Sequence, residues 1–118
     1  MKYMLLIQQG TTPVPGSEEW ERLSEDEQKA VYAAYQSINE TPGLTPGVRM
    51  GPPETATTVR VEGGSTLTTD GPFVETKEAL GGYLFLEAPD LDAAIELAAR
   101  IPAASMGGAI EIRPVVES

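Results

Sequence analysis

The densest group of polar side chains in the chain lies in one short loop, Asp70-Gly71-Pro72-Phe73-Val74-Glu75-Thr76-Lys77-Glu78. Asp70 closes an expected strand and precedes a glycine, where the backbone turns sharply at low cost. Phe73 is a large apolar residue in polar surroundings, so we expect it to pack inward as an anchor. The loop thus offers the Asp70 carboxylate and the Lys77 ammonium group for proton transfer or ligand binding. The competing interpretation is that Asp70 only closes its turn and that the other charges are solvated.

The chemistry open to this loop is narrowed by two missing residue types, because the chain has no histidine and no cysteine. A Ser-His-Asp triad, a histidine-based zinc site and a disulfide are therefore excluded. Any acid–base role must fall on a carboxylate with a raised pKa, on a lysine or on a tyrosine. No spacing of acidic residues suggests an oxygen cage for a metal, and we predict neither a metal nor an organic cofactor.

The overall charge excludes further classes of partner. With 8 basic and 18 acidic residues, the formal net charge is −10. Such a surface repels the phosphates of nucleic acids and of anionic membranes, so we predict that the protein binds neither. The apolar run at the N-terminus ends at Gln8, which is too short for a signal peptide core or a membrane span. A cytoplasmic location is expected.

The elements that must position the loop follow from periodicity and from turn residues. We expect strands over Lys2–Gln9 and Tyr83–Leu86, a hairpin of 56–61 and 65–69, and a last strand near Ile110–Ile112. We expect one helix that begins at Ser17 or Ser24 and ends at Thr41-Pro42-Gly43, and its buried apolar stripe comprises Val31, Ala34, Tyr35 and Ile38. We expect a second helix that begins at Asp90 and ends at Pro102, and its buried apolar stripe comprises Leu91, Ala94, Ile95 and Ala98. Loops are expected over 44–54, 70–82 and 103–108.

The order of these elements predicts one α+β domain over residues 1–118. It is a ferredoxin-like β-α-β-β-α-β plan with an antiparallel sheet and both helices on one face. The opposite face needs a cover that the chain itself does not supply. A second copy of the sheet is the economical solution, so we expect a homodimer.

The loop from Asp70 to Glu78, followed by Leu80-Gly81-Gly82-Tyr83, resembles the signature of the DGPF family, the YCII-related proteins. Similar stretches are Met1–Ile7, Ala56–Arg60 and Ile110–Val115. The resemblance implies a dimeric α/β barrel in a cytoplasmic bacterial protein whose gene often neighbours those of alternative sigma factors. It also implies kinship with small-molecule enzymes that use a His-Asp pair in the cleft.

The chain departs from that pattern at the loop before the last strand. Many relatives carry a histidine there, whereas this chain has Ala103-Ala104-Ser105-Met106-Gly107-Gly108. A His-Asp mechanism is therefore excluded, and only Asp70, the acidic partner, carries over as the candidate catalytic residue. Phe73, Lys77 and Met106 are the candidate ligand-binding residues. Arg49 and Arg60 could meet an anionic ligand, although the alternation of Arg60 with Val59 and Val61 favours a solvated strand face for that residue. We expect the four tyrosines to be core or dimer contacts.

Two functions remain open at this point. The first is an enzyme that acts on a small molecule without a cofactor, by proton transfer, elimination or isomerisation, with Asp70 at the edge of the cleft. The alternative is a non-catalytic ligand-binding or regulatory domain associated with a sigma-factor system. A cavity next to Asp70 would favour the first function, and a filled, shallow cleft would favour the second.

Overall fold

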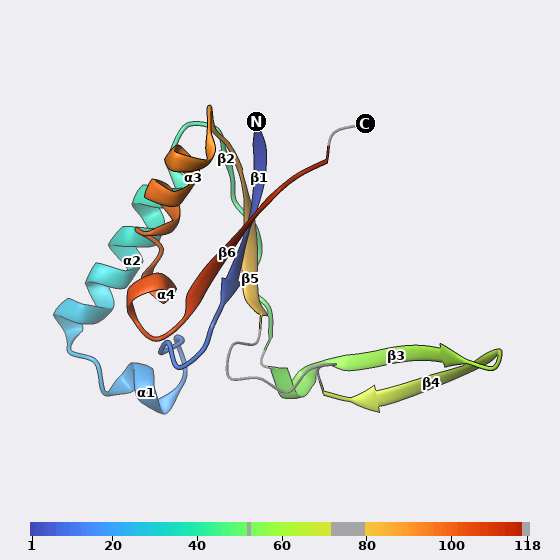
Figure 1. Ribbon diagram of the computed structural model, residues 1–118. Helices are drawn as coiled ribbons and strands as arrows, with labels where there is room; N and C mark the ends of the chain where they lie inside the picture. The colour runs from blue at the N-terminus through green and yellow to red at the C-terminus, as the bar shows by residue number, and fades with distance from the viewer. Residues whose placement is uncertain (52, 72–79, 117–118) are drawn as a thin grey trace.

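The main sheet has four antiparallel strands in a computed structural model that describes residues 1–51, 53–71 and 80–116. In order across the sheet, the strands are β2 (Leu44–Thr45), β5 (Leu80–Glu87), β1 (Lys2–Gln8) and β6 (Ala109–Pro114). The longer helices α2 (Glu25–Asn39) and α3 (Leu91–Ala98) both lie on one side of this sheet (Figure 1). The strand order and the one-sided helical layer confirm the predicted ferredoxin-like α+β fold.

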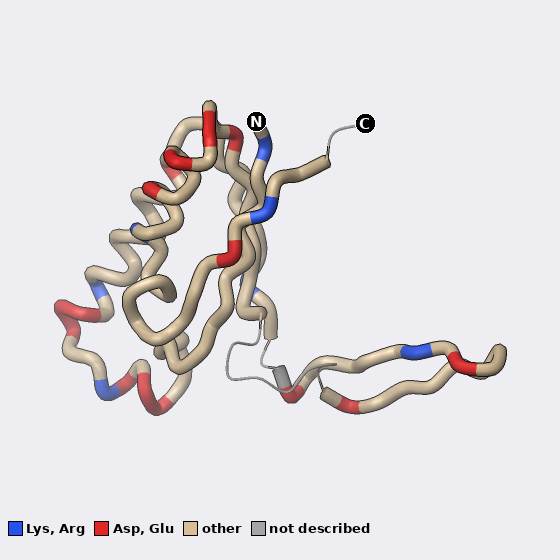
Figure 2. Tube along the Cα trace, in the orientation of Figure 1, with Lys and Arg blue, Asp and Glu red and all other residues tan. Residues whose placement is uncertain are grey.

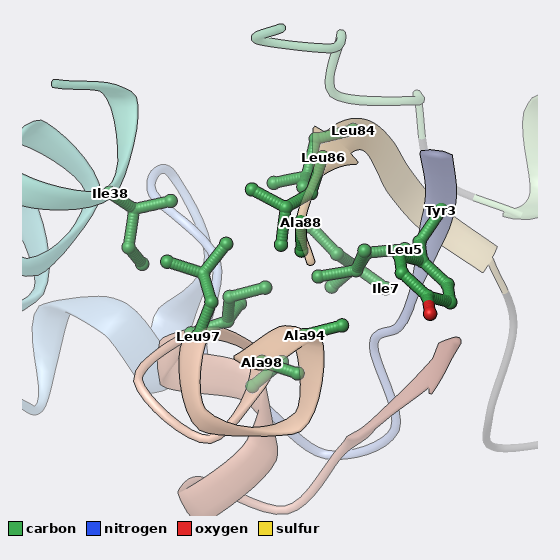
Figure 3. Close-up of a cluster of buried hydrophobic side chains, with 12 residues drawn as sticks. Tyr3, Leu5, Ile7, Ile38, Leu84, Leu86, Ala88, Ala94, Leu97 and Ala98 are labelled. Atoms are coloured by element: carbon green, nitrogen blue, oxygen red, sulfur yellow. The ribbon is translucent and has the colours of Figure 1, made fainter. Parts of the chain in front are cut away.

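The core lies between the sheet and the helices because alternate strand residues point to the same face. Tyr3, Leu5 and Ile7 of β1 and Leu84 and Leu86 of β5 are buried there. They meet buried side chains of the helical layer, chiefly Ile38, Ala94, Leu97 and Ala98 (Figure 3). Full burial of a Leu or Ile side chain contributes about 1.5–3 kcal/mol, so this layer contains the main apolar stabilisation of the fold.

Both serines that could begin the first helical region act as N-caps, each for its own helix. Ser17 caps the short helix α1 (Glu18–Glu21), accepting a hydrogen bond from the Trp20 amide at 3.1 Å. Ser24 caps α2 through a capping box, in which the Glu27 amide donates to the Ser24 hydroxyl and the Ser24 amide donates to the Glu27 carboxylate. The predicted box is thus confirmed, and it fixes the start of α2.

The prediction that residues 44–54 form only a connecting loop is wrong. Leu44 and Thr45 form the edge strand β2, which pairs with β5, and Arg49 forms a further isolated bridge with Gly82. Because β5 already begins at Leu80, the predicted loop over 70–82 is also too long. The prolines and glycines in 44–54 favour a loop. Pairing with β5 is a tertiary interaction, and it overrides this local conformational preference.

Two predictions for the second helical region need correction. The segment predicted as a loop from Ala103 begins with a single helical turn, α4 (Pro102–Ser105), in which Pro102 takes the first position that suits proline. In α3, Leu91 and Ile95 are about half exposed, whereas Leu97 is buried in their place. The buried stripe is therefore Ala94, Leu97 and Ala98, and it is rotated around the helix relative to the predicted one.

The predicted hairpin is present, but it forms a separate two-stranded sheet instead of joining the main one. Strands β3 (Thr57–Glu62) and β4 (Ser65–Asp70) follow the short 3₁₀ turn η1 (Pro53–Thr55) and project away from the body (Figure 1). The turn uses Gly63 and Gly64 at positive φ, 56° and 79°, as a type I′ turn requires. We call this hairpin the β3–β4 arm, and nearly all of its residues are exposed.

The face of the main sheet opposite the helices carries an apolar group without a helical cover. Met4 pairs with Phe85 and Leu6 pairs with Tyr83 in the register of β1 and β5, and all four side chains are half-buried. The Phe85 and Tyr83 rings meet edge to face, with centroids 5.9 Å apart. We call Met4, Leu6, Tyr83 and Phe85 the open face.

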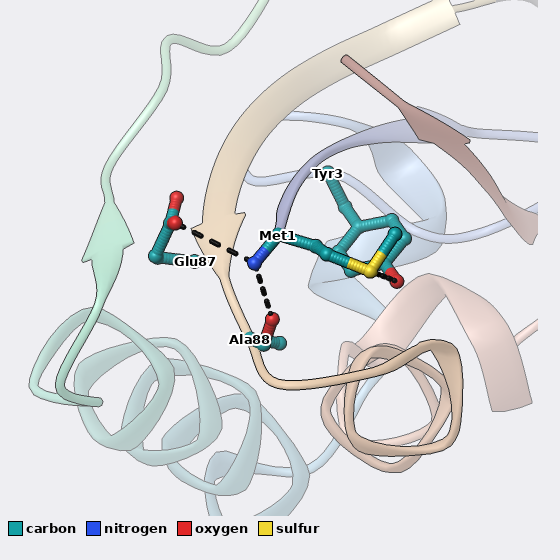
Figure 4. A network of polar contacts seen from close by, with 4 residues as sticks. All are labelled: Met1, Tyr3, Glu87 and Ala88. Carbon is teal, nitrogen blue, oxygen red and sulfur yellow. Dashed lines mark hydrogen bonds and ion pairs between the residues drawn. The ribbon is translucent and has the colours of Figure 1, made fainter. Parts of the chain in front are cut away.

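The first residues of β1 are fastened to the end of β5 (Figure 4). The Met1 amino group donates to the Ala88 carbonyl at 2.9 Å and lies 3.6 Å from the Glu87 carboxylate. The Tyr3 hydroxyl points back to the Met1 sulfur at 3.6 Å. These contacts fix the register of the two central strands at one end, opposite the end at which Ile7 and Gly82 pair.

Candidate functional site

A cavity of about 340 Å³ lies between α2 and the end of the main sheet at which β5 begins. Five segments supply its walls: the end of β1 with the following loop, the α2 helix, the stretch 46–49, the start of β5, and the α4 region. Known small-molecule pockets span roughly 300–1,000 Å³. The cavity is thus large enough for a small organic molecule and too small for a polymer.

The walls of the cavity are largely apolar and stiff. Four of the lining residues are prolines, whose backbone φ is fixed. They are joined by aliphatic and aromatic residues, and the apolar lining comprises Pro13, Pro15, Pro46, Pro102, Val14, Val31, Val48, Leu84, Tyr32 and Tyr35. Such a wall keeps its shape without a ligand, so a ligand entering it orders little of the protein.

The stretch 46–49 is held against β5 by close backbone contacts. A side chain at Gly47 would overlap the Tyr83 carbonyl oxygen, so only glycine fits there. Arg49 bridges Gly82, and the Met50 amide donates to the Gly81 carbonyl at 2.8 Å. The Gly81-Gly82 pair therefore brings this stretch onto the sheet and sets the position of Arg49 at the cavity.

Arg49 is the charged residue among the described residues that line the cavity. Tyr35 lies within its electrostatic influence: burial raises the pKa of the Tyr35 hydroxyl above its ordinary value of 10.0, and Arg49 partly opposes that shift. The Tyr35 hydroxyl accordingly keeps its proton at neutral pH and is a hydrogen-bond donor. Acidic residues are spread instead over the helical layer and the ends of the arm (Figure 2).

The loop after β1 forms part of the cavity wall and is anchored to the segment that carries Met106. The Thr11 amide donates to the Gly107 carbonyl at 3.1 Å, and Gln9 donates to the Thr12 carbonyl at 3.3 Å. The Thr12 hydroxyl is buried and finds no hydrogen bond among the described residues. The polar side chains that this loop contributes to the cavity, Gln9 and Thr12, are therefore both uncharged.

A family model for the YCII-related domain matches residues 1–118. The chain belongs to the YCII-related domain family. This YCII-related domain is also 33% identical, over 108 residues, to an uncharacterised protein of Rhizobium meliloti (strain 1021), an alignment that covers 91% of this chain and 84% of that protein. The family membership predicted from the loop and its flanking stretches is confirmed.

The structure separates the residues that the sequence grouped into one site. Met106 lines the cavity, as predicted for a ligand-binding residue. Asp70 ends β4 on the arm, where it pairs with Thr57 and is exposed, and it is not among the described residues of the cavity wall. Phe73 and Lys77 lie outside the described residues. The catalytic role of Asp70 stays a prediction.

Sequence reasoning named Arg49 among the possible anion contacts and assigned Tyr35 to the core or a dimer contact. Tyr35 does pack against the core, and it also lines the cavity, which was not predicted from the sequence. Its helical spacing with Val31 and Ile38 was visible, yet only Ile38 is fully buried, and Val31 and Tyr35 face the cavity. The signal that could have located the site was Gly81-Gly82, because paired glycines in a strand mark a close approach of another backbone.

Two kinds of feature are absent from the described residues. Residues 1–51, 53–71 and 80–116 contain no group of three or more Asp, Glu, His or Cys side chains that could hold a metal ion. No described helix is long and apolar enough to cross a membrane.

Proposed function

We propose that this YCII-related domain binds a small, largely apolar organic molecule in the cavity between α2 and β5, and that it does so as a homodimer. The observation that carries the proposal is the cavity itself, with its stiff apolar walls and a single cation, Arg49, among the described lining residues. Preformed apolar pockets with a few polar groups are the usual form of small-molecule sites.

Binding is favoured over acid–base catalysis by the chemistry of the lining. The described residues of the wall include no carboxylate, and the chain has no histidine. Tyr35, the titratable neighbour of Arg49, is protonated at neutral pH, and burial raises its pKa further above the ordinary value of 10.0. A general base that works near neutral pH needs a pKa close to that range, and these groups do not supply one.

A catalytic role for Asp70 is the second candidate, and one observation favours it over the simple turn interpretation. Among the described residues, the Asp70 carboxylate has no hydrogen-bond partner. It remains available for a ligand. A regulatory role beside a sigma factor stays an expectation from the family resemblance alone.

The homodimer is supported by the open face. Met4, Leu6, Tyr83 and Phe85 form a half-buried apolar group at the centre of a sheet, bordered by Glu111 and Arg113 of β6. Covering it with a second copy of itself would remove these side chains from water, at a gain of about 25 cal/mol per Å² of apolar surface. An isologous contact of this kind gives a closed two-fold dimer.

The dimer can be tested by light scattering on purified protein. We expect the wild type to have about twice the 12.6 kDa mass of one chain, and Leu6→Glu, which places a charge on the open face, to give the monomer. Leu91→Glu, which changes an exposed residue of α3, serves as the matched control and should stay dimeric. A monomeric wild type at micromolar concentration contradicts this part of the proposal.

The binding function can be tested by filling the cavity. A library of small apolar organic compounds would be screened by thermal shift, and the hits would be titrated against Val31→Trp and Met106→Trp, which place an indole in the wall. Ala33→Trp, on the exposed side of α2, is the control. We expect both filled variants to lose binding while the control keeps it. Hits that bind all the variants equally, or a screen without hits, would overturn the proposal.

A further inference from the structure

We infer that the molecule bound in the cavity is a monocarboxylate with an apolar body, and that Arg49 is the residue that pairs with its carboxylate group. This inference rests on the proposed function, because it names the class of ligand for the same cavity. The residues that carry it are Arg49 and Tyr35, together with the backbone contacts that hold Arg49 in place.

Arg49 differs from the other arginines of the chain in having no side-chain partner within the described residues. Each of the other four contacts a polar side chain: Arg22 with Glu18 at 3.9 Å, Arg60 with Glu62 at 2.8 Å, Arg113 with Glu111 at 3.8 Å, and Arg100 with Ser37 at 2.9 Å. Within the described part of the chain Arg49 lacks a carboxylate partner, although the chain has 18 acidic residues. A guanidinium left without a carboxylate at the rim of a cavity is thus available to an anion from outside.

The position of Arg49 is set by its backbone. Its bridge to Gly82, the hydrogen bond between Met50 and Gly81, and the contact of Gly47 with the Tyr83 carbonyl fix the stretch on both sides of it. A guanidinium that starts from a fixed backbone loses less freedom when it binds, and its planar fork matches a carboxylate with two parallel hydrogen bonds.

Tyr35 adds a neutral donor beside this cation. Because its hydroxyl is protonated at neutral pH, it can donate a hydrogen bond to an anion near Arg49 without adding charge. The described wall contains no second cation. The guanidinium neutralises a single negative charge, and the hydroxyl adds a hydrogen bond. A phosphate dianion would leave one negative charge unneutralised in a protein whose net charge is already −10.

The rest of the ligand is defined by the walls. Prolines 13, 15 and 46 and the side chains of Val14, Val31 and Val48 surround the cavity. These side chains offer no hydrogen bond, so the part of the ligand that packs against them is expected to be apolar, because a hydroxyl or amide group there would lose water without replacing it. An aromatic or alicyclic ring fits this surface, and its carboxylate would lie at the Arg49 side.

The inference can be tested with matched ligands. Benzoate, phenylacetate and cyclohexanecarboxylate would each be titrated by calorimetry or NMR beside the corresponding primary amide and beside phenyl phosphate. For the wild type we expect at least one carboxylate to bind about 10- to 100-fold more tightly than its amide, as for charge-assisted hydrogen bonds. Arg49→Gln should reduce that ratio to about 2-fold or less, whereas Arg49→Lys should retain part of it. Thermal unfolding of each variant would confirm that it is folded.

Arg22→Gln is the control for general electrostatics, since it removes the same charge from an exposed helix end. We expect it to keep the preference for the carboxylate. Equal binding of amide and carboxylate by the wild type, an equal effect of Arg22→Gln and Arg49→Gln, or tighter binding of phenyl phosphate would each overturn the inference. If the amides still bind and Val31→Trp still blocks them, the proposed function stands while the inference fails. If no compound binds, both fail.

Discussion

The cavity and the β3–β4 arm are built in opposite ways. The cavity is assembled from five segments that lie far apart in the sequence, and its walls rest on the buried core of the sheet. The arm consists of two consecutive strands with both faces exposed, and its Val59, Val61 and Leu67 side chains meet solvent. The arm ends at the conspicuous Asp70-Gly71 pair, whereas the space for a ligand is elsewhere.

This difference also shows in the shape of the molecule. The radius of gyration is 16.2 Å, above the roughly 13–14 Å expected for a compact domain of 118 residues. The projecting arm accounts for the excess (Figure 1). An isolated two-stranded hairpin is marginally stable in water, so the arm depends on its turn and its pairing, whereas the body depends on its core.

The largest effect is expected from truncating one leucine in each region. Leu5 is fully buried, so Leu5→Ala should lower the free energy of unfolding by about 2–5 kcal/mol. Leu67 on the arm is 45% exposed, and Leu67→Ala should cost about 0.5 kcal/mol or less. Denaturant unfolding of both variants would measure this. A comparable loss for Leu67→Ala would mean that the arm is packed in solution, against a second copy.

A smaller effect is expected at the backbone contact that places Arg49. Gly47→Ala introduces a methyl group that overlaps the Tyr83 carbonyl, and overpacking of this kind costs about 1–3 kcal/mol. Gly51→Ala is the matched control, because its added carbon would meet only the Thr55 hydroxyl, at 3.1 Å. We expect Gly47→Ala also to weaken ligand binding, as Arg49 moves. If binding is unchanged in both variants, the stretch 46–49 does not shape the site.

The helical wall of the cavity offers a third and weaker test. Removing the cap with Ser24→Ala should cost about 1 kcal/mol. The backbone and hydroxyl of Ser24 hold the pKa of Glu27 below its ordinary value of 4.5. The ionised Glu27 carboxylate of the capping box should thus stabilise α2 fully above pH 4.5, and this stabilisation should be lost as the pH falls through the lowered pKa of Glu27. The difference between the unfolding curves of wild type and Ser24→Ala should therefore become smaller in acid without vanishing, because the hydrogen bond from the Glu27 amide to the Ser24 hydroxyl does not titrate. A difference that does not depend on pH would exclude a role for the Glu27 charge.

The smallest effect is expected on the arm itself. Asp70→Asn keeps the size of an exposed side chain that has no hydrogen bond among the described residues, so stability should change by about 0.5 kcal/mol or less. Because Asp70 is not in the described wall of the cavity, ligand affinity should also stay within about 2-fold. If Asp70→Asn is folded but loses ligand binding or turnover, the functional site includes the arm, and the predicted catalytic role of Asp70 is supported.

The sequence predicted those parts of the fold that depend on local signals. The capping box at Ser24, the glycine turn at Gly63-Gly64 and the strand β1 were each predicted from neighbouring residues, and each is found. The edge strand β2 and the bridge at Arg49 are not, because only contact with β5 makes those residues extended.

The site was harder to predict than the fold for the same reason. Val31 and Tyr35 lie together on α2, but Arg49 and Met106 join them only when three segments pack together, and the spacing of these segments along the chain does not indicate it. The conspicuous loop at Asp70 drew attention because its residues are adjacent in sequence. Adjacency makes a motif easy to see, but a cavity needs walls from distant segments.

The central claim is that the ligand binds in the cavity, and an NMR titration of ¹⁵N-labelled wild-type protein with phenylacetate tests it most directly. We expect the amide signals of Gly47, Val48, Gly81 and Gly82 to shift as the ligand is added, while those of Thr66 and Thr68 on the arm stay in place. Shifts confined to the arm around Asp70, with the four cavity amides unchanged, would contradict the account.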